Sequence, residues 1–134
     1  VNAANSALAP GSGVDGAIRR AAGPEITRAT AALGECPTGE AVITPGFELP
    51  AKWVIHTVAP VFREHSRNEV VRLLTHCYRN ALAIADWKDI RSIAFPSLGT
   101  GIYGVPIGLA CPIAVAAARA HVAEGCRQDE IVFC

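Results

Sequence analysis

Residues Ile90 to Gly104 read IRSIAFPSLGTGIYG, and this stretch decides the fold class. Its first part, Ile90–Pro96, is a short apolar run that predicts a strand. The next part, Ser97–Gly104, contains three glycines and predicts a loop. An alanine-rich segment, Ile107–Val122, follows and predicts a helix. A strand that passes through a glycine-rich loop into a helix is a basic unit of α/β folds.

The beginning of the chain repeats this order. Val1–Asn5 has the pattern of a strand end, Leu8–Gly13 is a turn-forming, glycine-rich stretch, and Val14–Ala22 carries apolar residues at helical spacing. Strands and helices also alternate in the remaining segments, so we expect an α/β layered sheet with helices on its faces. These further predicted elements are helices at Pro24–Leu33 and Asn68–Ala85 and strands at Glu40–Thr44, Lys52–Ala59 and Glu130–Phe133.

The composition describes an ordered chain. It has 134 residues, of which 51% are hydrophobic and 18% charged, and we expect one domain over residues 1–134. No apolar run reaches the roughly 18 residues that would indicate a membrane span. The formal net charge is zero, so no broad positive field attracts nucleic acid or an acidic membrane. An anionic ligand would therefore have to be held by local donors.

The cysteines and histidines lack the spacing of a metal site. The five cysteines form no C-x-x-C pair, and the four histidines form no H-E-x-x-H motif. We therefore expect no metal site and interpret the cysteines as reduced, mostly buried thiols of a cytoplasmic protein. The chain opens on Val1 and closes on an apolar run, Ile131–Cys134, which we interpret as a domain truncated at both ends.

Two glycine-rich stretches have the features of phosphate-binding loops. Gly11–Gly16 leads into the first helix, and Ser97–Gly104 follows a buried strand. Glycines allow backbone N–H groups to turn toward one point, and a following helix adds the positive end of its dipole. Each charge-assisted hydrogen bond contributes about 1.5–3 kcal/mol, so two or three suffice for micromolar binding. The alternative is that both stretches are tight turns, and neither is a Walker loop.

Blocks of sequence that together span nearly the whole chain share a recognisable order and spacing. They are Val1–Asn5, Gly13–Ile18, Ala21–Pro24, Thr38–Ala41, Leu49–Lys52, Val54–Val58 and Phe95–Gly104. In this order and spacing the chain resembles the macrodomain family, particularly its hydrolase branch. The resemblance implies a three-layer α/β/α domain with a mixed central sheet, ADP-ribose across its top and no cofactor.

The resemblance also implies which residues contact the ligand. In the family the two glycine-rich loops hold the diphosphate and the distal ribose. Tyr103 would then pack against the distal ribose, and Asn5 would bind ribose hydroxyls through its carboxamide. The implied ADP-ribose contacts are Ala4, Asn5, Ser12, Gly13, Val14, Asp15, Ser97, Gly99, Thr100, Gly101, Ile102 and Tyr103.

Asn5 and Asp15 are the candidate catalytic residues. Asp15 matches the acidic residue that the hydrolase branch uses beside the distal ribose, where an aspartate orients or deprotonates a water. Such a role is typically worth about 10²–10⁴ in rate. The alternative is that Asp15 stabilises its helix, since an acidic residue in the first turn favours the helix dipole. The two roles are compatible.

Other polar and aromatic residues are assigned structural roles. We interpret His56 as a packed, hydrogen-bonded core histidine rather than a base, and Glu40 as a turn or strand-edge residue rather than a second carboxylate. Trp53 and Trp87 are expected in the core or at a helix end. A solvated helix face, rather than an RNA-binding surface, is expected for Arg19, Arg20 and Arg28.

The sequence departs from the family pattern at several positions. Pro10 and Ser12 stand where relatives often have glycine, Arg19 where histidine is common, and Gly99 where serine is frequent. We expect these changes to tune affinity rather than abolish it. Relatives also have segments before and after the residues of this chain that contribute to adenine recognition.

The sequence therefore predicts a monomeric enzyme. The expected reaction is hydrolysis of the bond that joins the distal ribose of ADP-ribose to a protein carboxylate or to an acetyl group, as in O-acetyl-ADP-ribose. One alternative is a module that binds ADP-ribose without turnover, and the Asn5/Asp15 pair favours the enzyme over it. Another is binding of RNA or poly(ADP-ribose), which would require a basic stripe that the neutral composition lacks.

Overall fold

A computed structural model describes residues 1–134 of the chain. Five strands alternate with four α-helices, and one short 3-10 helix lies between β3 and α3. In chain order the elements are β1 (Asn2–Ala3), α1 (Gly13–Ala22), α2 (Glu25–Leu33), β2 (Ala41–Pro45), β3 (Trp53–Thr57), η1 (Phe62–Glu64), α3 (Arg67–Trp87), β4 (Ser92–Phe95), α4 (Ile107–Ala123) and β5 (Glu130–Phe133).

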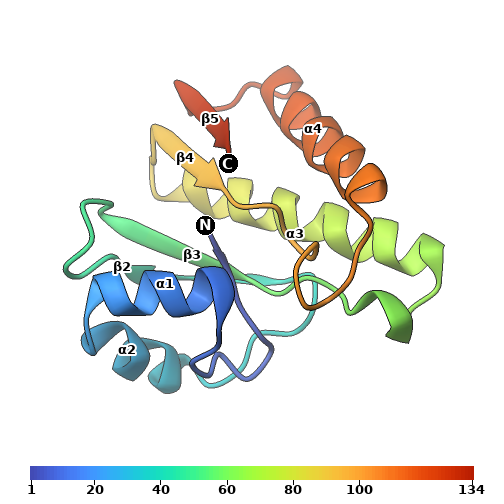
Figure 1. The fold of residues 1–134 in the computed structure, drawn as a ribbon. Helices are drawn as coiled ribbons and strands as arrows, with labels where there is room; N and C mark the ends of the chain where they lie inside the picture. Colours follow the sequence, from blue (N-terminus) through green and yellow to red (C-terminus); the bar gives the residue numbers. More distant parts are fainter.

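The strands are mixed in direction. β3 pairs in parallel with β1 and antiparallel with β2, and β4 pairs in parallel with β5. The Val1 amino group donates to the carbonyl oxygen of Ala94 at 2.7 Å, so β4 lies beside β1. Figure 1 shows β1, β3, β4 and β5 pointing the same way. The loops that follow β1 and β4 therefore leave the strands at the same edge.

The alternation of side chains along β3 explains why helices pack on both faces of the strands. Side chains of successive strand residues point to opposite faces. Val54 packs with Ala22 and Ile26 of α1 and α2, whereas Ile55 belongs to the larger core cluster formed with α3, β4 and α4. Helices thus cover both faces of the strands (Figure 1), and the expected three-layer α/β/α fold is confirmed.

The third helix is the longest, and its start is specified locally. Ser66 accepts a hydrogen bond from the Glu69 backbone N–H, and the Glu69 carboxylate accepts one from the Ser66 backbone N–H. This reciprocal capping box satisfies two amide donors at the helix start. None of the helices combines the length and apolar character needed to cross a membrane.

Two expectations about burial are wrong. Arg19 is only 8% exposed, because buried acceptors from its own helix and from neighbouring segments surround its guanidinium. Among the cysteines, only Cys36 and Cys77 are buried, so the expectation of mostly buried thiols fails. Trp87 does lie at a helix end, but its side chain is 74% exposed and makes a cation–π contact with Lys88, whose Nζ lies 4.6 Å from the ring centroid.

Candidate functional site

The loop between β1 and α1 presents unpaired backbone donors. The four successive backbone N–H groups from Ser12 to Asp15 donate to no acceptor of the protein. Ser12 is the N-cap of α1, yet its side chain makes no capping hydrogen bond. The first N–H groups of a helix have no acceptor within it and lie at the positive end of its dipole. This helix start therefore has the character of an anion site.

The loop between β4 and α4 presents a second set. The five successive backbone N–H groups from Gly99 to Tyr103 also donate to no acceptor of the protein. Two hydrogen bonds close the loop, from the Val105 N–H to the Gly99 oxygen at 2.9 Å and from the Gly104 N–H to the Gly101 oxygen at 3.0 Å. Its donors are thus oriented by the backbone itself and left free for a ligand.

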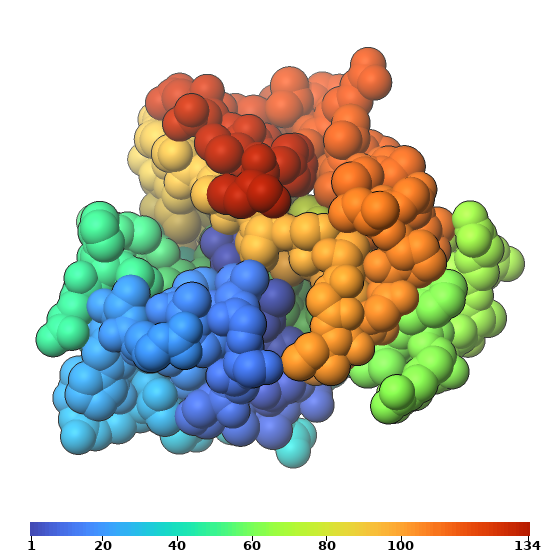
Figure 2. Space-filling model, in the orientation of Figure 1, coloured from blue at the N-terminus to red at the C-terminus, as the bar shows by residue number.

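Gly99 is required by this geometry. Its φ of +80° lies in the left-handed region, and a Cβ there would lie 3.0 Å from Val105 Cγ2 and 3.2 Å from Ala59 Cβ. A side chain would therefore be both strained and crowded. The two donor loops follow neighbouring strands, and Figure 2 shows the corresponding segments next to each other on one face of the molecule.

The two candidate catalytic side chains meet at Gly11. A Cβ on Gly11 would lie 3.4 Å from Asp15 Oδ2 and 3.7 Å from Asn5 Nδ2. The Asn5 carboxamide closes its own loop, since Nδ2 donates to the Ala9 oxygen at 2.9 Å and Oδ1 accepts from the Ala9 N–H at 3.1 Å. One amide hydrogen and one lone pair of Asn5 remain for a ligand.

Asp15 is 4% exposed and accepts hydrogen bonds at both carboxylate oxygens. Oδ2 accepts from the Gly11 N–H at 2.7 Å and from Arg19 Nε at 2.9 Å, and Oδ1 accepts from Asn2 Nδ2 at 2.7 Å. Its charge is therefore compensated by Arg19, and its orientation is determined by three donors. Oδ1 retains a lone pair for one further donor.

Behind Asp15 the network continues into the sheet. Asn2 Nδ2 also lies 3.1 Å from His56 Nδ1, and His56 Nε2 lies 2.9 Å from Thr44 Oγ1. One amide nitrogen donates to both Asp15 and His56, so Nδ1 accepts and Nε2 carries the ring proton. Burial, followed by repulsion from Arg19, lowers the pKa of His56 to about 4. The expectation of a packed, hydrogen-bonded core histidine is confirmed. Neutral His56 holds Asn2, which in turn donates to Asp15.

The remaining predicted contacts lie on or beside the loops. Ala4 is buried, and its N–H extends the β1–β3 pairing to the Thr57 oxygen. Thr100 Oγ1 donates to Ser97 Oγ at 2.8 Å, which leaves the Ser97 hydroxyl hydrogen free. Tyr103 is half-buried. Val14 is 41% exposed and Ile102 is 86% exposed, one beside each set of free donors.

Some residues of this site were assigned no role from the sequence. Asn2 and Thr44 belong to the Asp15 network, Arg19 is expected on the surface, and Gly11 is expected only as part of the glycine-rich loop, not as a donor to Asp15. Asn2 and His56 are cross-strand partners in the β1–β3 register, so their contact depends on strand pairing between distant segments. Local spacing carries no signal for that pairing.

The structure contains no group of three or more His, Cys, Asp or Glu side chains able to hold a metal ion. Two cavities lie away from the donor loops. One, of about 260 Å³, lies between α3 and α4 and includes Arg79 and His121, and the other, of about 510 Å³, is lined by residues that include Val1 and Trp53. Neither is lined by a residue of the two loops.

Comparison with known proteins agrees with this geometry. The model of the Macro domain family matches residues 1–114. The chain belongs to the macrodomain family. A macro domain-containing protein of Ralstonia nicotianae is 58% identical over 134 residues, covering 100% of this chain and 76% of the relative.

Two further relatives carry names or titles with functional content. The O-acetyl-ADP-ribose deacetylase of Escherichia fergusonii is 48% identical to this macrodomain, over 99% of this chain and 77% of the relative. The solved structure of the Oceanobacillus iheyensis macrodomain with ADP has a TM-score of 0.91 and 42% identity, covering 98% of this chain and 73% of that one.

Proposed function

We propose that this macrodomain binds ADP-ribose through the two donor loops and hydrolyses bonds to its distal ribose. The observation that carries the proposal is the pair of unpaired backbone donor runs, Ser12–Asp15 and Gly99–Tyr103, at the same edge of the strands. A diphosphate offers acceptor oxygens on both sides, so each run can bind one face of it. The ADP-bound structural relative and the deacetylase relative support the choice of ligand.

The proposed reaction uses water as its only co-substrate. With O-acetyl-ADP-ribose, water adds to the acetyl carbonyl, the bond from that carbon to the ribose oxygen breaks, and acetate and ADP-ribose leave. With an ADP-ribosylated protein, the ester between the distal ribose and a protein carboxylate is split in the same way. The water supplies a hydroxyl to one product and a proton to the other.

The contacts of Asp15 define its proposed role. Three donors already occupy its carboxylate, and one lone pair of Oδ1 remains. Asp15 therefore orients the attacking water by accepting one of its hydrogens. Asn5, whose carboxamide also lies next to Gly11, holds a ribose hydroxyl so that the bond to be split lies next to that water.

Calorimetric titration with ADP-ribose, together with acetate release from O-acetyl-ADP-ribose, tests the proposal. Saturable heat and measurable turnover are expected. Absence of heat at millimolar ADP-ribose would contradict both binding and catalysis. Binding without turnover would contradict the hydrolase proposal and leave the alternative of a module that binds ADP-ribose without hydrolysing it.

The Asp15→Ala variant tests the catalytic part. Turnover should fall by about 10²–10⁴, and binding should change far less. Because the substitution removes the partner of a buried guanidinium, activity is assayed below the melting temperature of the variant. A variant that is folded and fully active would require a different catalytic residue.

A further inference from the structure

Arg19 connects the catalytic side chain to three other positions. Its Nε donates to Asp15 Oδ2 at 2.9 Å, and its Nη2 donates to the Leu8 oxygen at 3.0 Å. Its Nη1 lies 3.1 Å from the hydroxyl oxygens of both Thr27 and Thr30. One buried guanidinium thus joins α1, the loop after β1, and α2.

The contact with Leu8 involves a strained part of the loop. Leu8 has a φ of +53° although it is not glycine, and it is 2% exposed. A left-handed conformation is strained for such a residue, so surrounding contacts have to hold it. Arg19 supplies one of them at the Leu8 oxygen, and the Leu8 N–H donates to the Asn5 oxygen. The same turn therefore places Asn5.

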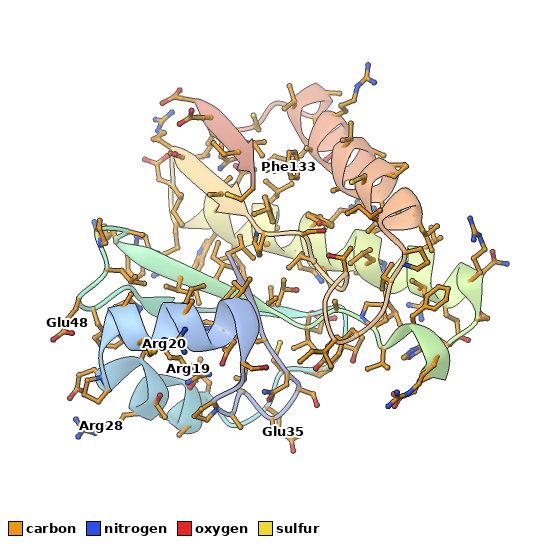
Figure 3. All side chains as sticks on the ribbon, viewed as in Figure 1. Arg19, Arg20, Arg28, Glu35, Glu48 and Phe133 are labelled. Carbon is orange, nitrogen blue, oxygen red and sulfur yellow. The ribbon has the colours of Figure 1, made fainter.

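Arginine is the residue type that fits these acceptors. The guanidinium presents five N–H donors in a rigid plane, which suits four acceptors that surround it from different segments. A lysine ammonium has three donors on one nitrogen, and an imidazole has at most two. The neighbouring Arg20 shares α1 with Arg19 (Figure 3) but is exposed, so the position on the helix decides the role.

We propose that Arg19 is a positioning residue for the hydrolysis proposed above. Its guanidinium holds the Asp15 carboxylate and the Asn5-bearing turn in one geometry without touching the substrate. This inference rests on the proposed function for its effect on turnover, whereas its effect on the loop is independent of any activity.

The test compares Arg19→Lys, Arg19→Met and the matched control Arg20→Met. For both Arg19 variants, kcat for acetate release should fall roughly ten- to hundredfold, because small misplacement of a catalytic group has effects of that size. KM should stay within about threefold, since the free backbone donors of both loops remain. Arg20→Met should keep both constants. Wild-type kcat in Arg19→Lys would overturn the proposal.

A second measurement separates this proposal from the proposed function. Hydrogen exchange of the Gly11 amide, which donates to Asp15, should be slow in the wild type and at least tenfold faster in Arg19→Lys, with exchange in the α3 core unchanged. If the wild type shows no turnover, the hydrolase proposal fails while this result still tests the positioning role. Unchanged Gly11 exchange in a folded Arg19→Lys protein would overturn the positioning role.

Discussion

The two donor loops reach the same edge of the strands by different means. The loop after β1 is braced by buried polar side chains, with Asp15, Arg19, Asn2 and His56 in one connected network. The loop after β4 has no such network. It is closed by two backbone hydrogen bonds and supported by the tight approach of Gly99 to Val105 and Ala59.

The difference indicates that the two loops have different roles in the proposed site. A side-chain network in a dry environment determines the direction of each polar group, as a catalytic carboxylate requires. A glycine loop whose tip is exposed needs only to offer its amide donors and can adjust to the ligand. The first loop should therefore be sensitive to charge and pH, and the second to backbone shape.

The largest expected effect is a pH dependence of stability from the first region. His56 has a folded-state pKa of about 4 against an ordinary value of 6.5, so the unfolded chain binds its proton more readily. The stability that depends on neutral His56 is complete above pH 6.5 and is lost as the pH falls toward 4. This group should lower the free energy of unfolding by about 3 kcal/mol over that range, measured by urea denaturation.

His56→Gln should remove this part of the pH slope, because glutamine does not titrate there. His76→Gln on α3 is the matched control, since that imidazole is partly exposed and lies outside the network, and the part of the slope that His56 causes should remain in this variant. Equal slopes for all three proteins would show that the buried network is not the acid-sensitive region.

The next effect concerns the backbone of the second loop. Gly99→Ala should lower the free energy of unfolding by about 2 kcal/mol, from left-handed strain and from crowding against Val105 and Ala59. Gly101→Ala in the same loop should change it by less than about 0.5 kcal/mol, because a Cβ there meets nothing within 4 Å. Thermal unfolding of both variants measures the two losses of stability. Equal losses for Gly99→Ala and Gly101→Ala would contradict the prediction.

The sequence predicted much of this architecture, for physical reasons. Helical periodicity and glycine-rich breaks are local signals, so α1, α3, α4 and both loops were located with errors of a few residues at their ends. The position of Asp15 in a first helical turn was also readable. The short helix Phe62–Glu64 carries no such periodic signal and was not predicted.

The burial of Arg19 could not be predicted from the sequence, because its hydrogen-bond acceptors come from three segments. Leu8, Asp15 and Thr30 become neighbours only after α1 and α2 pack together, and an arginine on an amphipathic helix ordinarily faces solvent. The pairing of Asn2 with His56 likewise depends on the β1–β3 register. The polar network around Asp15 thus combines local contacts, such as those with Gly11 and Arg19, with contacts between distant segments that no local pattern predicts.

The smallest expected effect separates ligand contact from stability in the second loop. Ile102 is 86% exposed at the loop tip, so Ile102→Ala should leave the free energy of unfolding nearly unchanged. If the tip covers bound ADP-ribose, the lost apolar contact should weaken binding by about 1 kcal/mol, or roughly fivefold in Kd by calorimetry. Val122→Ala on α4, at 56% exposure, is the control and should bind like the wild type. Equal affinity of both variants would mean that Ile102 stays in solvent when the ligand is bound, and the second loop would then contribute through its amides alone.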